Sequence, residues 1–319
     1  MRQCAERRDL MKFKIFKMNF TGAVHFGEGG LITSADTLMA DTVFAALCSE
    51  AALQGTDLLE KLVQCVSGGK FLLSDALPFI GKTLYVPKPI LEVRGRDEGN
   101  STIKKALKKL RFIPIDKLDV YLQGNLDIAE EAKYFHDNFS RPDLLEKVTV
   151  PEGEITRPYA VAIRRYQQGS GLYLCVGYED EETCDMFSEL LENMSYSGIG
   201  GKRSSGYGRF EVSVAGGGEA LIKRLQDRNA DRYMSLSISL PADNELDQVI
   251  GNADYLTVKR GGWVGSAAYA DTLRKKKDIY MLAAGSVFSA PFSGDIFDVG
   301  DGGKHPVYRY GKPMLMAIS

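Results

Sequence analysis

Cysteine and histidine are scarce in this sequence of 319 residues, and their positions exclude the common metal and disulfide frameworks. The five cysteines are odd in number and include no C-x-x-C pair, so neither a zinc ribbon nor a disulfide framework is indicated. The three histidines, His25, His136 and His305, lie far apart and show no H-E-x-x-H spacing. We therefore expect no metal, no cofactor and the reduced thiols of a cytoplasmic protein.

Long hydrophobic runs and a surplus of one charge are also absent. No apolar run approaches the ~18 residues of a membrane-spanning helix, and residues 1–9 carry no apolar signal core, so we expect no membrane partner. The chain has 40 Lys and Arg residues against 42 Asp and Glu residues, a formal net charge of -2. A protein that coats nucleic acid non-specifically is usually more basic. Any nucleic-acid surface must therefore be a local patch.

The first half contains the alternating patterns of an α+β fold. Alternating apolar residues over 12–20 predict a strand, and a helical pattern follows, with Ser34 or Asp36 as its N-cap and Gly55 as its stop. The runs RPYAVAIRRY and LYLCVGY, joined by a glycine-containing turn, predict a β-hairpin. Acidic residues 179–182 open a second helix, and a last strand completes the order β-α-β-β-α-β. That order is ferredoxin-like and also builds RNA-recognition modules.

The remaining segments suggest how the chain is divided. Residues 1–11 are interpreted as a leader, and residues 12–215 as the first domain. Within it, residues 94–156 fit no simple pattern and are interpreted as an insertion. A second set of strands begins near Tyr233, and residues 233–319 are consistent with a second, β-rich domain of the same kind.

The most distinctive motif is the glycine loop, GIGGKRSSGYG, over Gly198–Gly208. Five glycines in eleven positions let a backbone approach a ligand closely and adopt positive φ angles. Between them lie two cations and two serines, which donate to phosphate and ribose oxygens, and a tyrosine that can stack on a base. A flexible surface loop with incidental charge is the alternative. The candidate RNA-binding residues of the motif are Gly198, Gly200, Gly201, Lys202, Arg203, Ser204, Ser205, Gly206 and Tyr207.

Neither common nucleotide-binding fingerprint fits the glycine loop. The Walker pattern needs Ser or Thr after Gly-Lys, whereas Arg203 follows Lys202, and the order here is helix–loop–strand. A G-x-G-x-x-G pattern fails because Arg203 stands where its third glycine belongs.

Two further segments supply candidate residues in the first half. His25, followed by Phe26 and Gly27, lies in an earlier glycine-containing loop. It can act as a general acid or base in RNA cleavage, contact RNA without chemistry, or be a loop histidine that only satisfies its own hydrogen bonds. Arg164 and Arg165 are neighbours in a strand and face opposite sides. One can therefore meet a ligand while the other meets solvent or a partner, the alternative being a solvated edge.

A last candidate, Lys259 with Arg260, stands in the second half. It begins the segment KRGGWVGS, which places two cations, two glycines and the only Trp of the chain at a strand end. A packed Trp is the commoner use of such a residue, but the Lys-Arg-Gly-Gly run is suited to a second close approach to phosphate.

Four segments of the chain, taken together, carry a family resemblance. They are HFGEGG after the first strand, SADTLMADTVFAALC on the following helix, GIGGKRSSGYGRFEV after the second helix, and KRGGWVGS. They resemble the RAMP superfamily of CRISPR proteins. More closely, the chain is similar to the subunit of the type III-A (Csm) effector complex that caps the 5′ end of the guide RNA, and the likeness covers nearly all of residues 12–319.

The resemblance implies two ferredoxin-like (RRM-like) domains, the first with a thumb-like insertion. It implies a non-catalytic subunit in antiviral and anti-plasmid defence. That subunit binds the repeat-derived 5′ tag of the guide RNA (crRNA) and joins the large polymerase-like subunit to the backbone RAMP subunit. The insertion would press between guide and target RNA near the tag.

By position, the resemblance also assigns a groove for the tag. Gly198–Gly208 would hold tag phosphates and bases, His25 and Gly27 would line the same groove, and Lys259 and Arg260 would extend it. Two rival functions remain open at this stage. One is a RAMP-type endoribonuclease that processes precursor guide RNA with His25 as general acid or base, and the other is a protein scaffold without RNA contact.

Overall fold

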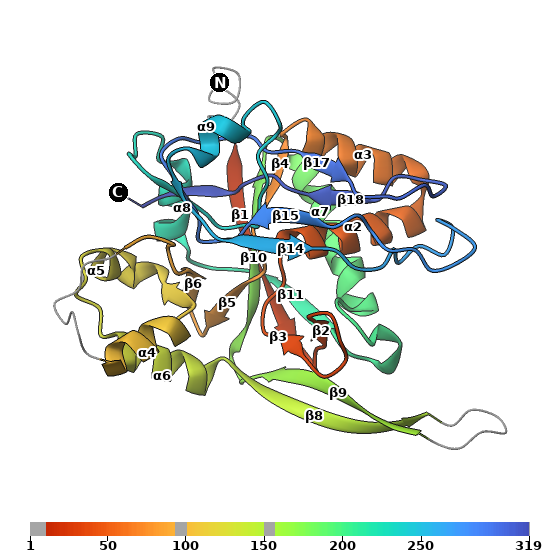
Figure 1. Cartoon of the computed structure of the whole chain (residues 1–319), viewed down its shortest axis with the longest axis horizontal. Coiled ribbons are helices and arrows are strands. Elements are labelled where there is room, and N and C mark those ends of the chain that lie inside the picture. The colour runs from red at the N-terminus through yellow and green to blue at the C-terminus, as the bar shows by residue number, and fades with distance from the viewer. Residues whose placement is uncertain (1–10, 93–100, 150–156, 319) are drawn as a thin grey trace.

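A computed structural model describes the protein over residues 11–92, 101–149 and 157–318. Of the predicted leader, residues 1–11, only Met11 lies within this part, and its side chain is buried. Residues 94–100 and 150–156 of the predicted insertion lie outside it. The described chain is a mixed α/β structure whose sheets are antiparallel (Figure 1).

A seven-stranded antiparallel sheet forms the centre of the first half. Its strand order is β11-β1-β10-β5-β6-β7, and β4 also pairs with β10. The predicted strand over residues 12–20 is confirmed as β1. The strands are β1 (Lys12–Phe20), β4 (Phe71–Leu73), β5 (Leu77–Ile80), β6 (Thr83–Pro87), β7 (Phe112–Pro114), β10 (Ser170–Tyr178) and β11 (Phe210–Val214).

Strand β10 is buried along its whole length because both faces of the sheet are covered. Leu172 and Leu174 pack in the apolar cluster beneath the helices α2 (Ala40–Gln54), α3 (Thr56–Ser67) and α7 (Glu181–Ser197). Tyr173 and Cys175 alternate with them and pack in a second cluster. Side chains of a strand point alternately to its two faces, so burial on both faces accounts for the continuous apolar run LYLCVGY.

Helix α2 begins at Ala40, and the predicted N-caps Ser34 and Asp36 are wrong. Met39 provides no side-chain cap. The Ala40 N–H instead donates to Oδ1 of Asp75 at 2.7 Å. A carboxylate distant in sequence therefore replaces the local cap. The predicted stop at Gly55 is confirmed, as is the acidic start of the second helix, where Asp180 caps α7.

The predicted hairpin between RPYAVAIRRY and LYLCVGY is also wrong. β9 (Arg157–Tyr166) pairs along its length with β8 (Ser140–Thr149), from Ser140 opposite Tyr166 to Thr149 opposite Arg157. β10 pairs instead with β1, β4 and β5 inside the sheet. The β8–β9 arm projects from the body of the molecule (Figure 1).

The rest of the predicted insertion is partly built into the sheet, because β7 pairs with β6 at its edge. Three lysines of this segment, Lys105, Lys108 and Lys109, lie in a helix. The helical elements here are α4 (Ser101–Lys109), η1 (Ile115–Lys117), α5 (Leu118–Leu122) and α6 (Ile128–Asn138).

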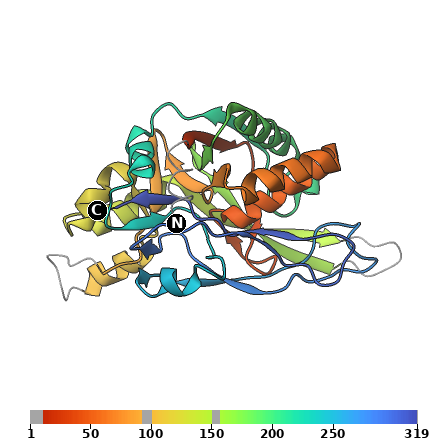
Figure 2. The same ribbon diagram turned by 90° about the horizontal axis from the view of Figure 1, so that it is seen from above.

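The second half consists mainly of short strands, which lie together on one side of the molecule (Figure 2). A four-stranded sheet has the order β13-β16-β12-β19, and two ribbons pair β14 with β15 and β17 with β18. The helices are α8 (Glu219–Gln226) and α9 (Leu246–Ile250). The strands are β12 (Tyr233–Ser235), β13 (Ala253–Asp254), β14 (Thr257–Arg260), β15 (Ile279–Leu282), β16 (Val287–Phe288), β17 (Ile296–Asp298), β18 (Tyr308–Tyr310) and β19 (Leu315–Ala317).

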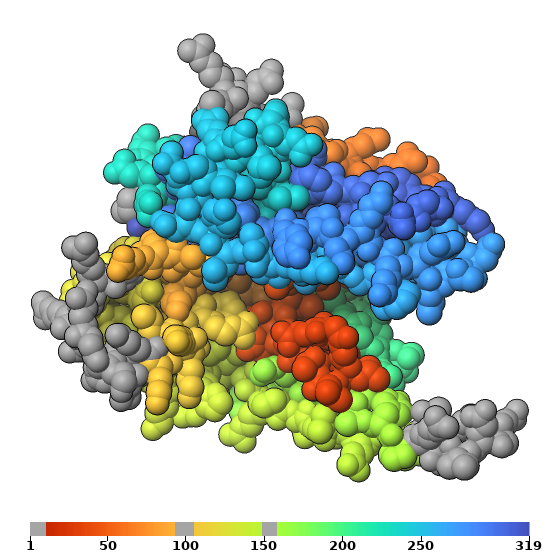
Figure 3. Space-filling view, in the orientation of Figure 1, coloured from red at the N-terminus to blue at the C-terminus, as the bar shows by residue number. Residues whose placement is uncertain are grey.

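The second half shares its core with the first. Met281 and Tyr310 pack in the cluster that contains Phe44 of α2, and Met234 and Met316 pack in the cluster that contains Tyr173 of β10. Figure 3 shows the second half above the β8–β9 arm and the small β2 (Phe26–Gly27) and β3 (Ser34–Ala35) ribbon. No helix within the described ranges is long and apolar enough to cross a membrane.

Candidate nucleic-acid interface

The glycine loop connects α7 to β11 and has an unusual backbone. Gly198, Gly200, Gly206 and Gly208 have φ angles of 80°, 95°, 82° and 79°. Lys202 has a φ of 60° and is the sole non-glycine residue of the described chain with a positive φ. These left-handed positions surround a single 3₁₀ turn, η2 (Arg203–Ser205). Such values favour glycine, so the glycine content of the motif is a requirement of its shape.

Most of the glycines approach protein backbone rather than open space. The Gly201 N–H donates to the His25 carbonyl at 2.8 Å, and the Gly208 N–H donates to the Ala23 carbonyl at 3.0 Å. A Cβ on Gly200 would stand 2.7 Å from the His25 carbonyl oxygen, whereas a Cβ on Gly206 would have no neighbour within 4 Å. The glycine loop is therefore fixed against residues 23–26, and its outward turn is open.

The outward turn carries the polar donors predicted from the sequence. Ser204 and Ser205 are exposed, and neither hydroxyl has a hydrogen-bond partner in the described part of the chain. Nη1 of Arg203 lies 3.8 Å from Oε1 of Glu50, a buried carboxylate on α2 that also accepts from the Ser197 hydroxyl at 2.5 Å. Sequence reasoning missed Glu50, because an acidic residue within a helix gives no local sign of burial.

Two cation–π contacts join the glycine loop to the β8–β9 arm. The Lys202 ammonium lies 5.0 Å from the ring centroid of Tyr159 on β9, and the Lys147 ammonium of β8 lies 4.6 Å from that of Tyr207. Tyr207 also packs against Ala23 and neighbouring apolar residues. The ring predicted to stack on a base is thus half-buried and already covered by a cation. Lys147 and Tyr159 were not predicted as contacts of the glycine loop, because the pairing of β8 with β9 was not predicted from the sequence.

His25 is buried, and its ring is held between backbone segments. Its Nδ1 lies 2.7 Å from the carbonyl oxygen of Ala162 on β9, and because a carbonyl can only accept, Nδ1 carries the proton. Nε2 lies 3.3 Å from the position of a Cβ on Gly27, and Phe26 beside it is buried. No carboxylate or second imidazole of the described residues is hydrogen-bonded to this ring. Its observed contacts join the first glycine-containing loop, residues 21–30 (the first loop), to the β8–β9 arm.

The two strand arginines face opposite sides, as predicted. Arg164 donates from Nε to the Ser34 carbonyl at 3.0 Å and from Nη1 to the Ser140 hydroxyl at 3.2 Å. Arg165 is exposed, and its guanidinium lies 4.0 Å from Asp143. Arg164 therefore supports the first loop, and Arg165 remains available at the surface.

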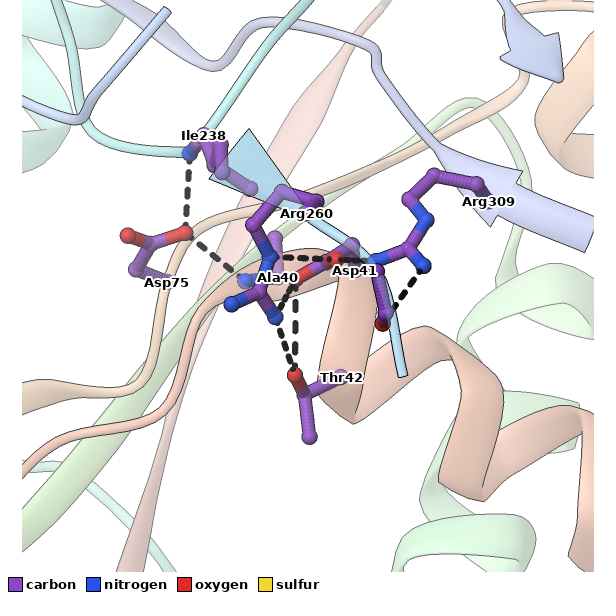
Figure 4. A network of polar contacts seen from close by, with 8 residues as sticks. Ala40, Asp41, Thr42, Asp75, Ile238, Arg260 and Arg309 are labelled. Carbon is purple, nitrogen blue, oxygen red and sulfur yellow. Dashed lines mark hydrogen bonds and ion pairs between the residues drawn. The ribbon is translucent and has the colours of Figure 1, made fainter. Parts of the chain in front are cut away.

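Lys259 and Arg260 are neighbours on β14 and also point to opposite faces of their strand. Lys259 is exposed and pairs with Asp278 at 2.8 Å. Arg260 turns inward, and its Nε and Nη2 each donate to a carboxylate oxygen of Asp41 at 2.9 Å (Figure 4). Arg309 binds the same carboxylate from β18. Arg260 thus anchors the second half on α2, whereas Lys259 faces solvent.

A second buried carboxyl group lies beside this ion pair. Oδ1 of Asp75 accepts from the backbone N–H groups of Ala40 and Ile238 at 2.7 and 2.9 Å (Figure 4). Burial raises the pKa of Asp75 to about 7, although the two hydrogen bonds act in the opposite direction. No cluster of residues able to hold a metal ion is found in the described ranges.

Comparison with known proteins gives a consistent family assignment. The family described as "CRISPR Csm4 C-terminal domain" matches residues 228–318. The "CRISPR system Cms protein Csm4" of Mycobacterium tuberculosis H37Rv is 37% identical over 310 residues, covering 97% of this chain and 98% of that protein. The protein of the same name from Streptococcus thermophilus is 33% identical over 322 residues, covering 97% and 99%.

Solved structures share the fold at lower identity. The crystal structure of a Csm3–Csm4 subcomplex of the type III-A CRISPR-Cas interference complex contains a chain with a TM-score of 0.66 and 20% identity, covering 95% of this chain and 98% of that one. A Csm1–Csm4 cassette in complex with cA4 contains one with a TM-score of 0.60 and 18% identity, covering 96% and 98%.

Proposed function

Because this chain belongs to the Csm4 family of CRISPR proteins, we propose that it is a non-catalytic subunit of a type III-A effector ribonucleoprotein that binds the 5′ tag of the guide RNA. The names of the relatives and the composition of the solved subcomplexes support this role. They also suggest two protein partners, a Csm3-type backbone subunit and the large, polymerase-like Csm1-type subunit. Together these would serve in antiviral and anti-plasmid defence in the cytoplasm.

The observation that carries RNA binding is the outward turn of the glycine loop. Two serine hydroxyls and the guanidinium of Arg203 stand on one exposed 3₁₀ turn, and the half-buried Lys202 immediately precedes it. Its backbone is fixed from behind by the His25 segment. Donors of this kind, held on a rigid support, suit the phosphate and 2′-hydroxyl groups of single-stranded RNA.

The other predicted residues divide between contact and support. Arg165 and Lys259 are exposed cations and can reach phosphate. His25 and Arg164 hold the first loop in place through their hydrogen bonds, so we assign them to support. For Arg260 the pairing with Asp41 favours anchoring over phosphate contact.

We also propose the finer description of the fold. The strand order β11-β1-β10-β5, with α2, α3 and α7 against it, supports a ferredoxin-like domain over residues 12–215. The predicted insertion, residues 94–156, would be the thumb that meets target RNA near the tag, and its strand β8 would do so together with β9, which follows the insertion. Residues 233–319 would be a degenerate copy, since their described part contains one short helix, α9.

Removal of the two cations of the turn tests tag binding. Lys202→Ala with Arg203→Ala should weaken binding of a tag RNA and lower the log–log salt dependence by about 1.4, because each lost phosphate contact contributes about 0.7 for single strands. A matched control is Lys108→Ala with Lys109→Ala, which removes the same charge from exposed positions on α4. Unchanged retention of guide RNA by the loop variant would favour a scaffold without RNA contact.

Incubation with repeat RNA in the absence of metal tests the non-catalytic assignment. We expect no cleavage, because the described residues place no second acid or base on the buried ring of His25. Specific cleavage that disappears in His25→Ala would establish the endoribonuclease instead.

A further inference from the structure

The ribbon of β14 and β15 continues beyond the ends of those two strands. Trp263 forms a bridge with Lys275. The Val264 N–H donates to the Arg274 carbonyl at 2.9 Å, and the Lys276 N–H donates to the Gly262 carbonyl at 2.8 Å. Residues 257–264 and 274–282 therefore form one extended two-stranded ribbon, which lies in the layer of C-terminal strands on the side away from α7 (Figures 1 and 2).

One face of this ribbon is committed to the protein interior. Val258, Ile279 and Met281 pack against the cluster that contains α2, and Arg260 binds Asp41. Because side chains alternate between the two faces of a strand, Lys259, Trp263 and Tyr280 point outward. Between the pairs Arg260–Ile279 and Trp263–Lys275 one strand has an extra residue, which interrupts the alternation as a bulge does. Lys275 is placed on the outer face by its contact with the Trp263 ring.

The outer face presents aromatic rings to solvent. Tyr280 stands opposite Lys259 and is 62% exposed, and Trp263 stands opposite Lys275 and is 56% exposed. The Lys275 ammonium lies 5.3 Å from the ring centroid of Trp263. Large aromatic side chains are usually buried in proteins, so two exposed rings, each opposite a lysine, on one short ribbon require an explanation.

The charge of the ribbon opposes that of the whole chain. Within residues 256–280 four cations are exposed, Lys259, Arg274, Lys275 and Lys277, against two exposed carboxylates, Asp271 and Asp278, whereas the chain carries a formal net charge of -2. Lys259 pairs with Asp278, but both side chains are more than half exposed, so the pair is weak and can be displaced. The side chains of Arg274 and Lys277 form no ion pair with any residue of the described ranges. The outer face is therefore a local positive patch around aromatic rings.

We propose that this outer face, formed by Lys259, Trp263, Lys275 and Tyr280, binds single-stranded nucleic acid. Bases would stack on Trp263 and Tyr280 while the lysines meet the phosphates, the arrangement typical of single-strand binders. Trp and Tyr are also enriched in protein–protein interfaces, but lysine is depleted there, so the lysines beside the rings favour nucleic acid as the partner. The face shares Lys259 with the proposed phosphate contacts, but Trp263, Lys275 and Tyr280 are not among those contacts, and none of the four residues lies in the glycine loop. This second face therefore extends the proposed RNA contacts beyond the glycine loop.

The sole Trp of the chain makes the test direct. Intrinsic fluorescence of the full-length protein, excited at the Trp band, reports on Trp263 alone. Titration with an oligouridylate of about 12 nucleotides, within the range of single-strand site sizes, should quench the emission and shift it. The quenching should weaken as salt is raised, because phosphate contacts release counterions.

Variants separate this face from other surfaces. Tyr280→Ala should weaken the oligouridylate affinity seen by Trp263 about fivefold or more, which is the lower bound for one lost stacking contact, and Lys275→Met should weaken it and reduce the salt dependence. Tyr196→Ala removes a tyrosine that is 70% exposed on α7 and should leave the titration unchanged. Lys202→Ala with Arg203→Ala should also leave it unchanged, which distinguishes this face from the glycine loop.

Three results would overturn the proposal. The first is Trp263 emission that does not respond to oligouridylate at low salt. The second is quenching that Tyr280→Ala leaves intact. The third is emission that responds only when a protein subunit is added, which would make the ribbon a protein-docking face.

Discussion

Asp75 is a buried carboxyl group that joins three segments of the chain. It follows β4, caps the first turn of α2 through Ala40, and accepts from Ile238 of the second half. Burial, reinforced by the negative charge of Asp41, raises its pKa to about 7, while the nearby Arg260 and the two backbone donors act to lower it. The group is therefore half-protonated near neutral pH.

The sign of its effect on stability follows from that shift. The pKa of Asp75 is higher in the folded protein than its ordinary value of 3.8, so folding favours the protonated form. Its contribution to stability is complete below about pH 4 and is lost as pH rises through about 7. Asp75→Asn keeps an oxygen acceptor and cannot ionise. Urea denaturation from pH 5.5 to pH 8 should show the variant gaining stability relative to wild type as pH rises. A constant difference between the two would contradict the assignment.

Two glycines of the glycine loop separate backbone strain from steric overlap. Gly206 has a φ of 82° and open space around it, so Gly206→Ala should cost only the left-handed conformation, about 1–2 kcal/mol. Gly200 has a φ of 95°, and its added Cβ would also overlap the His25 carbonyl oxygen. Gly200→Ala should therefore destabilise the protein more than Gly206→Ala in urea denaturation. Equal effects would mean that the loop is not pressed against residues 23–26.

At the scale of elements, the start of α2 is the point where the two halves meet. The Asp41 carboxylate is almost completely buried and binds Arg260 of β14 and Arg309 of β18. Removal of one partner from a buried ion pair leaves an uncompensated charge. Arg260 and Arg309 in the second half therefore depend on one side chain of the first half, Asp41, for their counterion.

Asp41→Asn should destabilise the protein by about 3–5 kcal/mol, because two arginines lose their counterion. The matched control is Asp57→Asn, an exposed position in the first turn of α3, where only the helix dipole is affected and the cost is at most about 1 kcal/mol. Denaturant midpoints of the two variants measure the difference. Comparable losses would show that the Asp41 pair contributes no more than a surface charge.

At the scale of the whole molecule, the two halves are not independent in their packing. Met234 and Met316 share a cluster with Ile15 and Tyr173 of the central sheet. A fragment of residues 228–318 should therefore lack a cooperative unfolding transition in calorimetry, since its isolated strands would expose the surface that this sheet covers. The full chain is expected to unfold in one transition. A fragment that unfolds cooperatively on its own would show an autonomous domain.

Local patterns predicted the elements well where the pattern was itself local. β1, the Gly55 stop of α2, and the acidic start of α7 were all confirmed, because alternation, a stop glycine and a capping carboxylate act over a few residues. Partners between segments were predicted poorly. β9 pairs with β8 and not with β10, since a turn-like linker between two strands does not require that they pair.

The same division holds for the candidate interface. The glycine spacing of the loop and the opposite faces of Arg164 and Arg165 could be deduced from the sequence, because backbone conformation and strand alternation are local properties. The contacts of Arg203 with Glu50 and of Lys202 with Tyr159 could not be deduced from the sequence, since α2 supplies Glu50 and β9 supplies Tyr159.

The sequence by itself determined the family and individual elements such as β1, the end of α2 and the start of α7, because these depend on the order and spacing of residues along the chain. Only the tertiary structure decided which cations face solvent. Lys259 and Arg260 are neighbours in sequence, yet strand alternation turns one to solvent while Asp41 binds the other. The availability of a charge depends on whether folding brings a buried counterion beside it, and no local pattern records that distance.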